Sequence, residues 1–125
     1  MNNKLSLLEW FVNNPLKQKI NGFINHNWNG ITTKAFAEVI KTIIQKNIDI
    51  PQNFHLVPKN VVSKFDLLKI LQKKYNRHDI NIIKTNANVS INRTITTIYK
   101  NVNKKIWQHT SYKKVPTIKK LIMDL

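Results

Sequence analysis

Residues 19–44 read KINGFINHNWNGITTKAFAEVIKTII, and their pattern is the main indication of the fold class. The first part of this stretch, Lys19–Ile24, is typical of a short strand, and the polar loop Asn25–Gly30 follows it. Thr32 or Thr33 then supplies the hydroxyl that caps a long helix. Apolar residues recur along this helix at intervals of three and four and predict one buried stripe, made of Phe36, Val39, Ile40, Ile43 and Ile44.

Further helices and strands are predicted on both sides of this unit. Two Ser-x-x-Glu/Asp sequences have the spacing of a capping box, in which the serine and the acidic side chain satisfy each other's backbone. The expected elements are a helix from Ser6–Glu9 that closes at Asn13–Pro15, a strand over Asn53–Val57, a helix from Ser63–Asp66, a strand over Asp79–Lys84, a short helix near Thr97–Lys104, and a closing helix that begins at Pro116 and carries Ile118, Leu121, Ile122 and Leu125.

Strands and helices therefore alternate, with helices at both ends. This order predicts an α/β fold, in which flanking helices cover a small and at least partly parallel sheet. We expect residues 1–125 to form a single lobe, because neither a low-complexity linker nor an internal repeat divides them. Three strands make a narrow sheet for so many apolar helix faces. The excess predicts an apolar surface that a partner covers.

The composition restricts the classes of function. The chain has 125 residues, 21 of them basic and 6 acidic, which gives a net charge of +15. Such a charge suits a polyanionic partner, but 19 of the basic residues are lysine, and an A/T-rich genome raises lysine, asparagine and isoleucine together. With no cysteine, the chain has no disulfide, no thiolate metal site and no thiol nucleophile. It lacks a membrane-spanning run and a signal peptide, so we expect a soluble, cytoplasmic protein.

Catalytic motifs are absent from the sequence. Gly22 and Gly30 are too far apart for a dinucleotide-binding loop, and no P-loop is present. None of the three tyrosines is followed four residues later by lysine, the pair that short-chain reductases use. The four histidines lie more than twenty residues apart, so no local motif holds a metal. The chain is expected to be inactive alone.

Three stretches have the chemistry of binding sites. The first is the loop with Trp28 and Asn29, which leads to the helix start at Thr32 and Thr33 and offers an indole, an amide and a helix N-terminus. The second is Arg93, one of two arginines. The third is the run from Lys104 to Lys114, where lysines alternate with Trp107 and Tyr112 as in a single-strand-binding patch. Each stretch has a plain structural alternative: a helix-capping loop, a surface arginine and a solvated lysine-rich loop.

The order of these pieces resembles the dTDP-4-dehydrorhamnose reductase-like family, within the extended short-chain dehydrogenases/reductases. The resemblance covers nearly the whole chain. Four landmarks carry it, in the family's order: Ile20–Thr33 followed by Phe36-Ala37, Phe54–Val57 followed by Val62–Leu68, Asn92–Thr97, and Val115–Ile118. Two positions depart from the family pattern, since Thr94 follows Arg93 where proline is usual, and Ile31-Thr32-Thr33 replaces a Ser/Ala-Pro-Thr sequence.

The family's enzymes reduce a keto-sugar on a nucleoside diphosphate with NAD(P)H. Since the glycine-rich motif and the Tyr/Lys pair are missing here, the resemblance implies the C-terminal, substrate-binding lobe of a Rossmann-type reductase, without the cofactor-binding half. It implies that Trp28, Asn29, Thr32 and Thr33 border the sugar-nucleotide cleft and that Arg93 approaches the diphosphate. No cofactor or metal is expected on this chain, and NAD(P) is implied for the complete enzyme.

The expected partners follow from the same resemblance. They are a nucleotide-sugar and either a separately encoded Rossmann-domain chain or further copies of this chain. A basic nucleic-acid-binding module and a non-catalytic regulatory subunit remain as alternatives. The sequence does not favour nucleic acid, because two arginines are few for phosphate recognition, and it predicts no membrane contact.

Overall fold

The computed structural model describes residues 6–125 and divides the chain into two compact units. The first unit consists of the residues through Asn27 together with Val62–Asn92. The second consists of Trp28–Val61 and Arg93–Leu125. Helices and strands are mixed in the fold, as the sequence predicts for the α/β class, and one strand pair is parallel.

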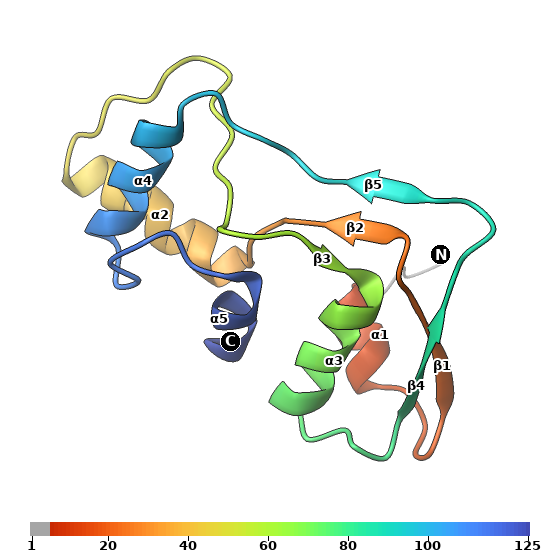
Figure 1. Cartoon of the computed structure of the whole chain (residues 1–125). Helices are drawn as coiled ribbons and strands as arrows, with labels where there is room; N and C mark the ends of the chain where they lie inside the picture. The colour runs from red at the N-terminus through yellow and green to blue at the C-terminus, as the bar shows by residue number, and fades with distance from the viewer. Residues whose placement is uncertain (1–5) are drawn as a thin grey trace, which may run out of the picture. The chain divides into compact units, whose positions relative to one another are not determined.

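The first unit is built on two parallel strands. β1 (Lys19–Phe23) pairs with β4 (Asn81–Thr85), and the register runs from Lys19 opposite Asn81 to Phe23 opposite Thr85. Parallel strands need a long crossover, and the crossover here ends in α3 (Lys64–Lys74), which packs against both strands. Figure 1 shows α1 (Leu7–Val12) beside α3. The buried side chains of these elements include Phe11, Ile20, Leu67, Leu68 and Leu71.

A second small sheet has the strand order β3-β2-β5. Its strands are β2 (His26–Trp28), β3 (Val62–Ser63) and β5 (Ile91–Arg93). The prediction of a loop over Asn25–Gly30 is therefore wrong in part, because β2 lies within it. The predicted strand over Asn53–Val57 is also wrong, since this segment joins no sheet in the described chain. Strand formation depends on a distant partner, which local periodicity does not reveal.

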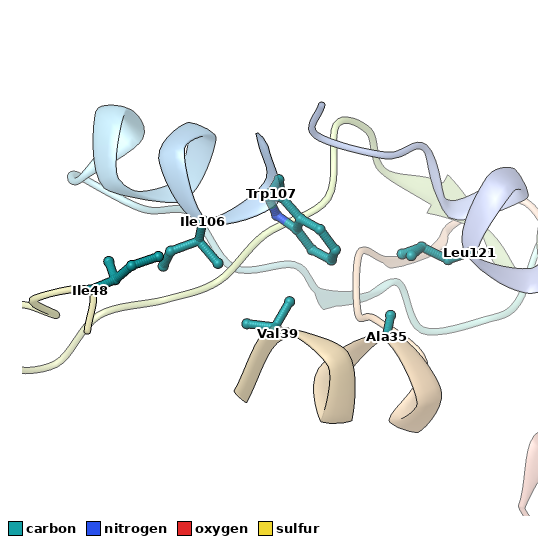
Figure 2. Close-up of a cluster of buried hydrophobic side chains, with 6 residues drawn as sticks. All are labelled: Ala35, Val39, Ile48, Ile106, Trp107 and Leu121. Atoms are coloured by element: carbon teal, nitrogen blue, oxygen red, sulfur yellow. The ribbon is translucent and has the colours of Figure 1, made fainter. Parts of the chain in front are cut away.

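The second unit is helical and has its own hydrophobic core. α2 (Thr33–Gln45) packs against α4 (Lys100–His109), and α5 (Ile118–Met123) adds to the same core. Figure 2 shows the Trp107 ring directed toward Ala35 and Val39 of α2, with Leu121 of α5 near its edge. The described part of the chain contains no helix that is long and apolar enough to cross a membrane.

The predicted helix starts at Ser6, Thr32 and Ser63 are confirmed, and the side chain of each of these residues caps its helix. Ser6 and Ser63 form the two capping boxes, and the Thr32 hydroxyl accepts a hydrogen bond from Ala35 N–H at 3.2 Å. Two of these helices end before an asparagine with positive φ, Asn47 at 48° and Asn76 at 52°. Asparagine tolerates the left-handed conformation better than most residues, so it takes a place that glycine often holds.

Other predicted helix details need correction. The buried face of α2 consists of Ala35, Val39 and Thr42, whereas Phe36, Ile40 and Ile44 of the predicted stripe are exposed. α4 begins later and is longer than the short helix predicted near Thr97–Lys104. The closing helix is capped by Thr117, so Pro116 lies outside its first turn.

Arg77 is a structural residue that links two parts of the first unit through hydrogen bonds. Its guanidinium donates two hydrogen bonds to the Asp79 carboxylate, each of 2.9 Å. It also donates to the backbone carbonyls of Val12, Asn14 and Pro15, which form the turn between α1 and β1. The hydrogen bonds from Arg77 lower the pKa of Asp79 to about 2.

Replacing Asp79 with asparagine is expected to change how stability depends on pH. The carboxyl has a folded pKa near 2 and an ordinary value of 3.8. Its ionised form therefore stabilises the fold above about pH 4, and this contribution is lost as the pH falls toward 2. Urea unfolding between pH 2 and 7 should show an Asp79→Asn deficit that is largest above pH 4 and shrinks below it. The exposed Asp49→Asn variant is the control, and a pH-independent deficit for Asp79→Asn would contradict this account.

Candidate functional site

The second unit contains a hollow of about 570 Å³, which we call the lysine hollow. Two extended segments, 57–61 and 95–97, form much of its wall, and Lys100 and Asn103 of α4 contribute a further part. Its lining consists of Asn29, Val57, Pro58, Lys59, Asn60, Val61, Ile95, Thr96, Thr97, Lys100, Asn103, Lys114 and Val115.

Two buried asparagines hold the walls of the lysine hollow. Asn103 Nδ2 donates to the carbonyl of Val57 at 3.1 Å, and Val57 N–H donates to Asn103 Oδ1 at 2.9 Å. Asn29 forms the same pair of bonds with Ile95, at 2.7 Å to its carbonyl and 2.9 Å from its N–H. Each side-chain amide offers the same donor and acceptor as a peptide group in a neighbouring strand. These hydrogen bonds therefore hold the two segments, although neither segment forms a strand.

Further bonds attach segment 57–60 to the rest of the unit. The Trp107 indole N–H donates to the Val57 carbonyl at 3.0 Å, so this carbonyl accepts two hydrogen bonds. Lys59 N–H donates to the carbonyl of Pro116 at 2.8 Å, and Ile118 N–H donates to Asn60 Oδ1 at 3.0 Å. These two hydrogen bonds join the wall to the start of α5.

The hollow combines positive charge with an apolar surface. Lys59, Lys100 and Lys114 are exposed lysines in its lining, which contains no acidic residue. Apolar side chains provide much of the remaining wall, from Val57, Pro58, Val61, Ile95 and Val115. Ammonium groups around an apolar surface favour a ligand that has both an anionic group and a flat or apolar part.

The structure brings one of the five predicted site residues to this hollow. Asn29 lines it, with both ends of its amide already bonded to Ile95. Thr32 caps α2 and Thr33 is the first residue of that helix. Arg93 is exposed at the end of β5 and is not among the lining residues.

Trp28 lies against the backbone of Gly30. A Cβ atom on Gly30 would lie 2.3 Å from Trp28 Cζ2, so glycine is needed there to leave room for the ring. The indole is half-buried, and it is not part of the lining of the hollow. Trp28 therefore packs over its own loop.

The lysine-rich run from Lys104 to Lys114 does not present a row of aromatic rings. Trp107 is fully buried, and the half-buried Tyr112 ring meets it edge to face at 5.6 Å between centroids. Burial, with a smaller effect of Asp124, raises the pKa of Tyr112 to about 12, so this phenol stays protonated at neutral pH. Within residues 6–125, no three His, Asp or Glu side chains gather where they would hold a metal ion.

Sequence reasoning missed the residues that give the hollow its character. These are the three lysines and Asn103. Among them, only Lys100 and Asn103 are related by their spacing in the sequence. They stand three residues apart and so lie on the same face of α4. Lys59 and Lys114 come from distant loops, and nothing local to either one distinguishes it from the other lysines.

A second hollow, of about 460 Å³, lies on segment 94–99. Its lining includes Asn53 and His55, and His55 Nδ1 lies 3.1 Å from the carbonyl of Thr96. Residues 95–97 line both hollows. A change that moves this segment therefore alters both.

Comparison with known proteins identifies the class of fold. No protein-family model and no curated protein matches this sequence. Among solved structures, the fold matches part of a reductase. That protein is a dTDP-4-dehydrorhamnose reductase from Clostridium acetobutylicum, an RfbD orthologue, with a TM-score of 0.63 and 13% sequence identity.

The match extends over 98% of this chain and 43% of the reductase. The resemblance read from the residues is thus confirmed at the level of the fold. The chain spans less than half the length of the solved structure that it matches.

Proposed function

We propose that this chain is the sugar-nucleotide-binding, C-terminal part of a dTDP-4-dehydrorhamnose reductase-like, NAD(P)-dependent oxidoreductase, and that it does not catalyse the reaction alone. The observation that carries the proposal is the fold match over 98% of the chain. The sequence lacks both a glycine-rich dinucleotide loop and a Tyr-x-x-x-Lys pair. We therefore assign cofactor binding and hydride transfer to a polypeptide that is equivalent to the rest of the reductase, the part that this chain does not match.

The lysine hollow supports this proposal on chemical grounds. A nucleoside diphosphate sugar carries two phosphates next to a flat base and a sugar ring. The ammonium groups of Lys59, Lys100 and Lys114 suit the phosphates, and the apolar wall suits the base. We also propose that the protein is soluble and cytoplasmic and that residues 1–125 form a single substrate-binding lobe.

The residues expected from the resemblance have different parts in this proposal. Asn29 is a positioning residue. Both ends of its amide hydrogen-bond to the backbone of Ile95 and so hold segment 95–97 in place. Arg93 is proposed to approach the diphosphate from the end of β5, where its side chain is exposed. Trp28, Thr32 and Thr33 are proposed to border the sugar.

Calorimetric titration of the chain with dTDP and dTDP-rhamnose tests the proposal. The triple variant Lys59→Gln, Lys100→Gln, Lys114→Gln should bind dTDP at least about tenfold more weakly, since it loses the three cations in the lining. The matched control is Lys46→Gln, Lys73→Gln, Lys105→Gln, which removes the same charge at exposed positions outside the hollow.

Equal affinities for the two triple variants would contradict the placement of the ligand in the hollow. Absence of saturable binding by the unmodified chain would contradict the function itself. Asn29→Ala adds a further measurement, because loosening segment 95–97 should weaken binding although the amide itself touches no ligand in this proposal.

A further inference from the structure

Two acidic side chains of the second unit meet at one turn. This unit holds three of the six acidic residues of the chain, Glu38, Asp49 and Asp124. Glu38 and Asp124 both bind the turn Thr110–Lys113, which follows α4 and leads to Lys114 in the lining of the lysine hollow. Because acidic residues are scarce in this chain, two carboxylates at one turn are a feature that needs an explanation.

Glu38 reaches this turn from α2. Ser111 donates two hydrogen bonds to its carboxylate, one from the backbone N–H to Oε1 and one from the hydroxyl to Oε2 at 2.9 Å. Hydrogen bonds to a charged acceptor are stronger than those between neutral groups, so the carboxylate holds Ser111 firmly. The next residue is held as well, because the Tyr112 side chain hydrogen-bonds to the carboxylate of Asp124.

The turn itself has an unfavourable backbone conformation. Lys113 has a φ of 63°, in the left-handed region that lysine seldom adopts. Its N–H donates to the carbonyl of Thr110 at 3.2 Å, and this hydrogen bond closes the turn. Such a conformation persists only when the contacts around it hold it in place. The two hydrogen bonds from Ser111 to Glu38 are contacts of this kind, because they fix the middle of the turn.

Lys114 lies between two fixed points of the chain. On its N-terminal side is the turn that Glu38 holds. On its C-terminal side, the Pro116 carbonyl accepts the hydrogen bond from Lys59 N–H at 2.8 Å. The backbone conformation of the residue before Lys114 sets the direction in which the chain continues. A change in the turn therefore moves Lys114 relative to Lys59, which lines the same hollow.

We propose that Glu38 is a positioning residue of the lysine hollow: its carboxylate holds the turn Thr110–Lys113, and the turn places the Lys114 ammonium group for binding of the anionic ligand. The identity of that ligand rests on the proposed function. Glu38 itself is not among the lining residues. It acts through hydrogen bonds and not through its charge, because a negative charge near the hollow would by itself weaken the binding of an anion. The two effects have opposite signs, so a measurement separates them.

Calorimetric titration with dTDP makes this measurement. Glu38→Ala removes both hydrogen bonds, so the affinity should fall about threefold, which is one lysine's share of the tenfold loss expected for all three. Glu38→Gln loses the charge, but its amide can accept from the Ser111 N–H and donate to the Ser111 hydroxyl, so it should bind dTDP as the unmodified chain does. Asp49→Ala, at an exposed position of the same unit, is the control for the loss of charge. Tighter binding by Glu38→Ala would overturn the inference, because charge alone predicts it.

A double-mutant cycle tests whether Lys114 is the residue that Glu38 positions. In a Lys114→Gln background, Glu38→Ala should have no further effect on dTDP affinity, whereas in a Lys100→Gln background it should still cost about threefold. Equal losses in the two backgrounds would show a general effect on the unit and would refute the positioning role. Circular dichroism verifies that the variants fold. If Glu38→Ala does not fold, Ser111→Ala, which removes one of the two hydrogen bonds, takes its place in the cycle.

NMR relaxation measures the positioning without a ligand and so separates this inference from the proposed function. The backbone order parameters of residues 111–114 should match those of α4 in the unmodified chain. They should fall in Glu38→Ala but not in Glu38→Gln or Asp49→Ala. Unchanged order in Glu38→Ala would overturn the positioning role, whether or not dTDP binds. Reduced order in Glu38→Ala, together with no binding of dTDP by the unmodified chain, would overturn the sugar-nucleotide function alone.

Discussion

Replacing Trp107 with alanine is expected to lower the free energy of unfolding by about 3–5 kcal/mol, the range for removing a fully buried tryptophan. The side chain has no exposed surface and belongs to the six-residue core of the second unit. It also meets Tyr112 edge to face, and its indole N–H donates to Val57. Truncation therefore removes packing, an aromatic contact and a hydrogen bond together.

Trp107→Phe keeps this prediction testable if the alanine variant does not fold. Phenylalanine retains most of the apolar volume but loses the indole donor, so a cost of about 1–3 kcal/mol is expected. Urea unfolding followed by circular dichroism gives both values without relying on tryptophan fluorescence. Trp10→Ala is the control, because Trp10 is 38% exposed. A larger loss for Trp10→Ala than for Trp107→Ala would contradict the assigned core.

Asn103→Ala is expected to cost about 2–4 kcal/mol, more than an average buried hydrogen bond. The variant leaves the backbone N–H of Val57 without its partner, and a buried donor left unsatisfied costs about 1–3 kcal/mol. It also removes the second bond, from Asn103 Nδ2 to the Val57 carbonyl, and opens a small cavity. The Val57 carbonyl keeps its bond from Trp107, which limits the loss.

The exposed Asn101, two residues earlier on α4, supplies the matched control. Asn101→Ala should be close to neutral. Asn103→Asp is a sharper variant, because it keeps the shape but replaces the donor with an oxygen that faces the Val57 carbonyl. We expect it to destabilise the protein at least as much as alanine at neutral pH. Similar stability of the Asn101 and Asn103 variants would refute the role of the amide.

Much of the fold was predictable because its causes are local. Ser6 and Ser63 begin helices through hydroxyls that bond to a backbone N–H three residues later. The strands Lys19–Phe23 and Asn81–Thr85 were found from short apolar runs, and the family resemblance from the order of landmarks. Periodicity also identified the closing helix with its buried Ile118, Leu121 and Ile122.

The errors arose where a distant segment decides the outcome. Residues 53–57 alternate like a strand, but strand formation requires a partner strand, and no strand among residues 6–125 pairs with them. His26–Trp28 looks like a polar loop, yet it pairs with strands that begin 36 and 65 residues further along the chain. On α2, periodicity cannot tell which of two adjacent apolar faces packs on the core.

The helix starts at Ser6, Thr32 and Ser63, the α/β class and the lack of a catalytic motif follow from residues that are close together in the chain. Which of the 18 asparagines are structural depends instead on contacts between distant residues. Asn29 bonds to Ile95 and Asn103 to Val57, across 66 and 46 residues of chain. A side-chain amide carries the same donor and acceptor as a peptide group, and only the folded backbone shows which asparagine meets one.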